Sequence, residues 1–332
     1  MSISIILILI ALIILIILFA IAFTIHSKVF GHRFNPNPLL KYFEADDFSL
    51  HAEPVEIPNE NDNNLCGYIY SKEKSDKGVV VFCHGFGPGH IAYTTEINYF
   101  CNQGYTVIAI DNLGCNLSHG KDMQGLYQGV KTAILATNYI KNNQKYKGYK
   151  IHLIGHSMGG YSAICASHDV ECDSVVAISS PLTPSTVMYC AVAGIIGKSF
   201  ASILRPFWFF INFLIFGKNG NLNSAKLALK SKAKKILIIQ GDLDSVVPLE
   251  YSAFGNVEEN QKIKKFLDKN KYHNPYASLN AQKLLNELGA RLMSSNKYSD
   301  EENRSYFNKF DFAAATEEDE NVMKLISEFI CE

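Results

Sequence analysis

The chain has 332 residues, enough for one large α/β domain with insertions or for two modest domains. Its 48% hydrophobic and 19% charged residues are typical of a globular chain, which excludes a disordered one. The net charge of −1, with no basic stripe among aromatic residues, gives no electrostatic basis for binding nucleic acid.

An uninterrupted apolar run opens the chain. Every residue from 5 to 23 is apolar, and at about 1.5 Å per residue the run nearly matches a hydrocarbon core of about 30 Å. The alternative is a cleaved signal peptide, because Ala20-Ile21-Ala22 imitates a cleavage site. No Lys or Arg precedes the run, however, and it is longer than an ordinary signal-peptide core. We therefore expect residues 1–25 to form an uncleaved transmembrane anchor.

Charge and cysteine content indicate the side of the membrane. Lys28, Arg33 and Lys41 follow the run and no basic residue precedes it, so the positive-inside rule places the main domain in the cytoplasm. The eight cysteines show no C-x-x-C and no metal-ligand spacing. In a chain of this size they favour reduced thiols and a reducing compartment. We expect a single-pass membrane protein with a cytoplasmic domain.

The rest of the chain predicts one large domain over residues 47–332. Residues 26–46 resemble a juxtamembrane linker, and residues 48–70 alternate around Asn and Asp turns, which predicts a β-hairpin. Strands and helices then alternate: strands at 78–83, 105–111, 150–154, 174–179, 235–240 and 262–267, and helices at 91–103, 123–142 and 159–168. Strands rich in Val and Ile and separated by helices predict a mostly parallel sheet flanked by helices.

An insertion at about 182–231 interrupts this alternation. Its core, residues 187–216, is apolar and aromatic, but Lys198, Arg205 and Pro206 interrupt it, which disfavours a second membrane span. We expect a helical cap over the carboxyl edge of the sheet. Its apolar face either lines a lipophilic pocket, dips into the bilayer surface, or packs against the main domain.

The segment Gly155-His156-Ser157-Met158-Gly159 joins a predicted strand to a predicted helix. This Gly-x-Ser-x-Gly spacing has the form of a nucleophile elbow, a sharp turn that exposes a serine hydroxyl above the sheet. Gly155 and Gly159 allow the strained turn and close helix packing. Ser157 could instead be an ordinary helix-capping serine. A catalytic role requires that other loops supply a base, an acid and donors to the oxyanion.

A glycine-rich turn, His84-Gly85-Phe86-Gly87, follows the predicted strand at 78–83. Such a turn can aim backbone N–H groups at the elbow, and we expect the Phe86 and Met158 amides to form an oxyanion hole. His84 and Gly85 are supporting residues, with His84 a structural, hydrogen-bonding histidine.

The acid and base that a serine nucleophile needs lie further along the chain. Asp242 and Asp244 follow the strand at 235–240, and either carboxylate could orient a histidine. His273, after the next predicted strand, is the only histidine downstream of both. The order Ser157, then aspartate, then His273 is the order of the α/β-hydrolase arrangement.

With these motifs the chain resembles the α/β-hydrolase superfamily, specifically capped serine hydrolases such as esterases and monoacylglycerol-lipase-like enzymes. The resemblance runs from about residue 78 to the C-terminus, and its pattern Gly241-x-x-Asp244 selects Asp244 over Asp242. A turn over residues 111–120 also matches, with Leu113 and Asn116 in place of a customary arginine and glycine. Asn tolerates the left-handed conformation, so only a local salt bridge is in doubt.

The C-terminal tail, from residue 277, is longer than a minimal family member needs. Its segment 316–330 predicts a capped closing helix.

Together with the apolar N-terminal run, the resemblance implies a membrane-anchored serine hydrolase that cleaves carboxylic esters, with a small-molecule ester as substrate. The anchor and the apolar insertion favour a lipid or acylglycerol ester. Ser157, Asp244 and His273 would be catalytic, with neither cofactor nor metal. An acyltransferase or a serine peptidase would share the triad, and a non-catalytic binding protein could retain the fold. A metal site at His168-Asp169 and residues 171–173 is less favoured than a solvated loop, and no phosphate loop or dinucleotide fingerprint is present.

Overall fold

An eight-stranded sheet forms the centre of the computed structural model, which describes residues 2–332. The strands run in the order β1-β2-β4-β3-β5-β6-β7-β8. Their bounds are β1 His51–Ile57, β2 Leu65–Ser71, β3 Val79–Cys83, β4 Thr106–Ile110, β5 Ile151–His156, β6 Ser174–Ile178, β7 Lys235–Gly241 and β8 Ile263–Asp268. The pairs β1–β2 and β2–β4 are antiparallel and the other pairs parallel, so the predicted hairpin and mostly parallel sheet are confirmed.

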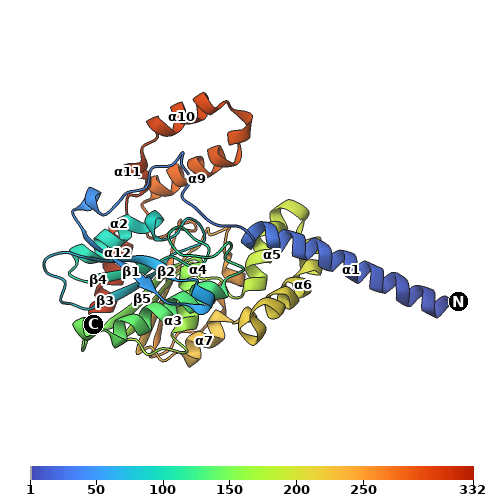
Figure 1. The fold of residues 1–332 in the computed structure, drawn as a ribbon, viewed down its shortest axis with the longest axis horizontal. Helices are drawn as coiled ribbons and strands as arrows, with labels where there is room; N and C mark the ends of the chain where they lie inside the picture. Colours follow the sequence, from blue (N-terminus) through green and yellow to red (C-terminus); the bar gives the residue numbers. More distant parts are fainter. Residues whose placement is uncertain (1) are drawn as a thin grey trace.

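Helices cover both faces of this sheet (Figure 1). On one face lie α3 (Tyr127–Asn142), α4 (Met158–Ala166) and α7 (Ser224–Lys230), and on the other α2 (Thr94–Asn102) and α12 (Glu320–Cys331). Because side chains of a strand alternate between faces, Val79 and Val81 belong to the first core, and Val80 and Phe82 to the second. The central strands are therefore buried on both sides, as their continuous apolar runs predict.

The N-terminal run forms α1 (Ile3–Phe30), which projects from the rest of the molecule in Figure 1. By length and composition α1 could cross a membrane, as could the helical stretch Lys198–Lys230. The helix continues past residue 26, where the linker was expected to begin, because Phe30 is buried in the core of the main domain. Beyond α1 the chain stays on the domain surface: Phe34 forms a bridge with Cys115.

The insertion between β6 and β7 contains α5 (Pro184–Ile196) and α6 (Lys198–Phe216), which form a hairpin beside α1 (Figure 1). The capping box of Thr183 and Pro184 in the first turn explain where α5 begins. Gly197, with φ of 84°, forms the turn between the two helices. Trp208 on α6 is fully buried, and its Nε1 donates a hydrogen bond to the Ala22 carbonyl at 3.1 Å.

The chain after β8 adds a second group of helices at the top of Figure 1. They are α9 (Leu279–Met293), α10 (Asp300–Lys309) and α11 (Phe312–Ala315). The short α8 (Ala253–Asn256) lies between β7 and β8. The predicted closing helix is confirmed as α12, with Asp319 as its cap: the carboxylate accepts the N–H groups of Asn321 and Val322.

Candidate active site

Ser157 lies in a strained turn between β5 and α4. Its φ is 55° and its ψ −119°, values that a residue with a side chain rarely adopts. A Cβ on Gly159 would lie 1.8 Å from the Cys83 carbonyl oxygen, and one on Gly155 only 2.3 Å from the Gly159 backbone. The close approach of α4 to the sheet therefore requires glycine at both positions, as the elbow motif predicts.

A continuous hydrogen-bond chain connects Ser157, His273 and Asp244. His273 Nε2 lies 3.0 Å from the Ser157 hydroxyl oxygen, and His273 Nδ1 lies 2.9 Å from Asp244 Oδ2. Since the carboxylate can only accept, Nδ1 carries the proton and Nε2 is left to accept from the serine hydroxyl. Three side chains that are far apart in the sequence are thus brought together in the order the motifs predict.

Further donors hold the Asp244 carboxylate in place. Its Oδ1 accepts the backbone N–H groups of Val246 and Val247 at 2.9 and 2.8 Å, and its Oδ2 accepts the Gln240 side-chain amide at 2.7 Å. Burial alone would raise the pKa of this carboxyl, but the hydrogen bond and charge of His273, together with the two backbone donors, lower it below its usual value. Asp244 is therefore ionised.

Asp242, the other aspartate after β7, makes its contacts with Asn270 and Lys269. Its Oδ1 accepts the backbone N–H of Asn270 at 2.7 Å, and its Oδ2 lies 3.7 Å from the Lys269 ammonium. These contacts stabilise a surface turn.

His84 and Gly85 lie in the loop that follows β3. The His84 ring is buried, donates through Nδ1 to the Gly85 carbonyl at 2.7 Å and accepts the Asn112 N–H through Nε2 at 2.9 Å. Burial lowers the pKa of His84, which agrees with a neutral ring. The contacts are those of the structural histidine that we expected.

Phe86 lies where this loop meets the N-terminal helix. Its ring is 48% exposed and packs edge-on against Phe30, with centroids 5.8 Å apart, and against Phe34 at 4.6 Å. Met158 is the first residue of α4, so its N–H has no partner within the helix. The expected oxyanion hole of the Phe86 and Met158 amides stays a prediction.

Sequence reasoning missed a second set of hydrogen bonds behind the first. The His156 ring donates through Nε2 to the backbone carbonyl of His273 at 3.0 Å, and Ser179 Oγ donates to the same carbonyl at 2.8 Å. The Tyr93 hydroxyl lies 3.0 Å from His156 Nδ1 and accepts the Gly85 N–H at 3.1 Å. The position of His156 inside the elbow motif is the one signal that the sequence offers for this second set.

A cavity of ≈ 410 Å³ opens beside Ser157 and His273. Its wall includes Phe86 and Tyr276, and on the C-terminal side Leu285 of α9 and Ala315 of α11. Within residues 2–332 no lining residue comes from 182–231, so the insertion does not line this cavity. The C-terminal helices α9 and α11, and not the insertion, supply apolar side chains to the wall of this cavity.

One buried acid faces the same cavity. Glu96 on α2 lines it, and burial raises the pKa of Glu96 to about 7. Burial, with the charge of Glu96 as a second cause, also raises the pKa of Glu318 to about 9. Burial thus favours the neutral form of both carboxyls, and the charge of Glu96 acts on Glu318.

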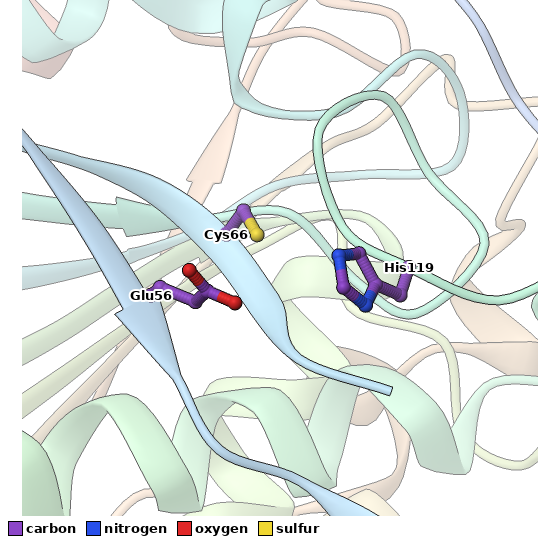
Figure 2. A group of neighbouring side chains, drawn as sticks. All are labelled: Glu56, Cys66 and His119. Atoms are coloured by element: carbon purple, nitrogen blue, oxygen red, sulfur yellow. The ribbon is translucent and has the colours of Figure 1, made fainter. Parts of the chain in front are cut away.

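Figure 2 shows a separate trio away from this cavity: Glu56 of β1, Cys66 of β2 and His119 of the loop after β4. Their donor atoms lie within 4.8 Å of one another, and such donors suit zinc. Glu56 and His119 are exposed, however, and Glu56 already accepts a hydrogen bond from Asn64. Burial and the charges of Glu56 and Asp111 raise the pKa of Cys66, which favours the thiol over the thiolate that metals bind. This trio is better described as polar surface of the hairpin.

Comparisons with known proteins agree with the geometry. A model of the serine aminopeptidase S33 family matches residues 74–209, and no curated protein sequence matches the chain. The Pyrococcus furiosus esterase Pf2001 has a similar structure, with a TM-score of 0.57 and 21% identity over 79% of this chain and 97% of that one. Acetyl xylan esterase 1 from Thermoanaerobacterium sp. JW/SL YS485 follows with a TM-score of 0.52 and 16% identity, over 81% of this chain and 92% of its own.

The matched segment 74–209 begins before β3 and includes the elbow. The two esterases cover 79% and 81% of this chain, and at these identities they establish the fold. From the topology and these comparisons, the chain has the α/β-hydrolase fold, and its residues 74–209 are similar to the serine aminopeptidase S33 family.

Proposed function

We propose that the protein is a membrane-anchored hydrolase of carboxylic esters in which Ser157 is the nucleophile. The observation that carries this proposal is the hydrogen-bond chain Asp244–His273–Ser157 at the mouth of a cavity. A cavity of this size is within the range of small-molecule sites. The esterases of similar fold favour an ester over other acyl substrates.

In this mechanism the Ser157 hydroxyl attacks the ester carbonyl while His273 Nε2 takes its proton. Asp244 holds the ring with Nδ1–H toward its own carboxylate and stabilises the imidazolium that forms. The Phe86 and Met158 amides stabilise the tetrahedral oxyanion, each worth about 3–4 kcal/mol. His273 then protonates the leaving alkoxide, and a water activated by the same ring releases the acid and restores Ser157.

A lipid or acylglycerol ester is the substrate that we favour. The aromatic contact of Phe86 with Phe30 joins the catalytic loop to the end of α1, so an anchored enzyme would hold its cavity near the membrane. The cavity wall carries Leu285, Tyr276 and Ala315, which suit an acyl chain. Acyltransfer and peptide hydrolysis would use the same triad with another acceptor or leaving group.

The anchor is proposed to be α1, with the catalytic domain in the cytoplasm. Residues 2–17 are exposed to the surroundings of the folded domain, and the basic residues Lys28, Arg33 and Lys41 follow the apolar run. Protease added to sealed vesicles should digest the domain from the cytoplasmic side. If protease added to the cytoplasmic side digests the domain only after detergent opens the vesicles, the domain lies on the opposite side of the membrane.

The catalytic proposal is tested by labelling with a fluorophosphonate probe. Wild-type protein should be labelled and Ser157→Ala should not, although both fold, as judged by circular dichroism. A panel of esters of increasing acyl length then tests the substrate class. Absence of labelling in folded wild-type protein would contradict the hydrolase, and hydrolysis limited to short soluble esters or to peptides would contradict the lipid substrate alone.

A further inference from the structure

The exposed part of α1 is too short to cross a bilayer by itself. Residues 2–17 are exposed, whereas from residue 18 onward one face of the helix packs against the folded domain, through Leu18, Phe19, Ile21 and Ala22. At about 1.5 Å per residue, the exposed apolar stretch from residue 5 to 17 is about 20 Å long, against a hydrocarbon core of about 30 Å. Immersing the whole apolar run to residue 23 therefore brings whatever packs on residues 18–23 into the membrane as well.

The element that packs there is α6. Trp208 on α6 donates its indole N–H to the Ala22 carbonyl at 3.1 Å, and the rings of Phe19 and Phe210 meet at 6.2 Å. Figure 1 shows α6 and α5 beside the C-terminal half of α1, projecting in the same direction from the sheet. Since Trp208 and Ala22 are fully buried, the two helices form one packed unit.

The outer face of α6 is apolar. Four large side chains on it are 47–59% exposed, namely Phe209, Phe210, Phe213 and Leu214. Between residues 207 and 216 there is no charged residue. The nearest basic groups lie outside this stretch: Lys218 follows the helix, and Arg205 lies with its guanidinium 5.9 Å from the Tyr251 ring of the main domain. A solvated face this large is unusual, because contiguous exposed apolar patches mark contact surfaces.

We infer that this face of α6 is immersed in the lipid bilayer beside α1, in the acyl-chain region next to the catalytic domain. The inference rests on the proposed anchoring by α1 and adds a second embedded helix that does not itself span. Lipid is the partner that fits, because the α6 surface is continuous with the exposed surface of α1 through Phe19 and Phe210. With two helices embedded the domain cannot rotate freely on its anchor. The Phe30–Phe86 contact then holds Phe86, which lines the cavity, near the membrane surface.

Tryptophan fluorescence in vesicles tests this inference, because Trp208 is the only tryptophan. The probe is Leu214→Trp in the full chain, and the matched control is Leu279→Trp, another exposed leucine on a helix, α9, which belongs to the C-terminal group of helices. Both are reconstituted into phosphatidylcholine vesicles with and without bromine atoms on the acyl chains. Relative to wild type, Leu214→Trp should add a blue-shifted emission that brominated lipid quenches. The emission added by Leu279→Trp should be red-shifted and unquenched.

Carbonate extraction of the same vesicles tests the anchoring by α1 separately from the embedding of α6. If the protein stays in the membrane but the added emission of Leu214→Trp behaves like that of Leu279→Trp, α6 lies in water and the inference is overturned, while the anchor stands. If carbonate releases wild-type protein, the anchor itself is wrong, and the embedded α6 falls with it. Equal thermal unfolding of both variants and wild type shows that neither substitution disturbs the fold.

Discussion

His156 Nε2 lies 3.0 Å from the backbone carbonyl oxygen of His273. A carbonyl only accepts, so this nitrogen carries the proton, and Nδ1 accepts from the Tyr93 hydroxyl. Burial first, and the proximity of His273 second, lower the pKa of His156 to about 3, which keeps the ring neutral. The residue before the proposed nucleophile thus positions the backbone of the proposed base.

We expect His156→Ala to lower kcat by roughly 10²-fold, because small misplacements of a catalytic group cost about this much. Ser179 still donates to the His273 carbonyl, so the loop should remain in place but less well aligned. His156→Gln, whose amide can donate to the same carbonyl, should recover part of the loss. Steady-state hydrolysis of a soluble ester measures both, and an unchanged kcat in His156→Ala would contradict a positioning role.

The Tyr93 hydroxyl connects Gly85, in the loop after β3, to His156 of the elbow. Tyr93→Phe leaves the Gly85 N–H and His156 Nδ1 without their shared partner in a buried site. The unfolding free energy should fall by about 1–3 kcal/mol, the usual cost of unsatisfied buried polar groups. Denaturant unfolding checks this. Tyr99→Phe is the control, because the Tyr99 hydroxyl has only a long 3.4 Å contact with Ser327 and the substitution should be nearly neutral.

Asp244→Asn should strongly lower kcat, although it replaces only one carboxylate oxygen with an amide nitrogen. The Val246 and Val247 N–H groups fix an acceptor at Oδ1, so the new amide nitrogen must face His273 and Gln240, both of which donate toward it in wild type. The His273 ring is then driven to the wrong tautomer, which in a serine triad lowers kcat by roughly 10⁴-fold. Ester hydrolysis and labelling kinetics measure the loss.

Asp242→Asn is the matched control for this variant. Asp242 lies in the same loop, but its carboxylate contacts Asn270 and Lys269 at the surface. Its activity should stay near wild type. Equal losses in the two variants would mean that Asp244 has no special role.

The strands were accessible from sequence because each is a continuous apolar run. Residues 78–83 were expected as a strand, and β3 occupies Val79–Cys83. Helix starts were less accurate, since they depend on single backbone conformations. The helix expected from residue 123 begins at Tyr127, because Gln124 has a φ of 61° and breaks the helical path. Asn116 does adopt a positive φ, 36°, as its place in the family turn predicts.

The site was predictable as far as chain order determines it. Ser157, Asp244 and His273 follow from the strands that precede them, whereas Tyr93 and Ser179 depend on where loops meet in space. The same holds for the turn that lacks its customary arginine: a guanidinium reaches it from Arg33, which donates to the carbonyls of Asn116 and Gly120. No local pattern in residues 111–120 could have indicated that long-range contact.

Glu96→Gln should stabilise the protein at high pH. Burial raises the pKa of Glu96 from 4.5 to about 7, so between these values the folded protein holds a proton that the unfolded chain has released. The unfolding free energy therefore falls as pH rises from 4.5 to 7, and Glu96→Gln removes that loss. At about 1.4 kcal/mol per pKa unit, the gain approaches about 3 kcal/mol at pH 8 and nearly vanishes at pH 4.

Urea unfolding at the two pH values measures this gain. The control is Glu301→Gln, which replaces an exposed acid on α10 and should leave the unfolding free energy nearly unchanged. A Glu96→Gln gain that is equal at pH 4 and pH 8 would mean that packing, not the buried charge, is responsible.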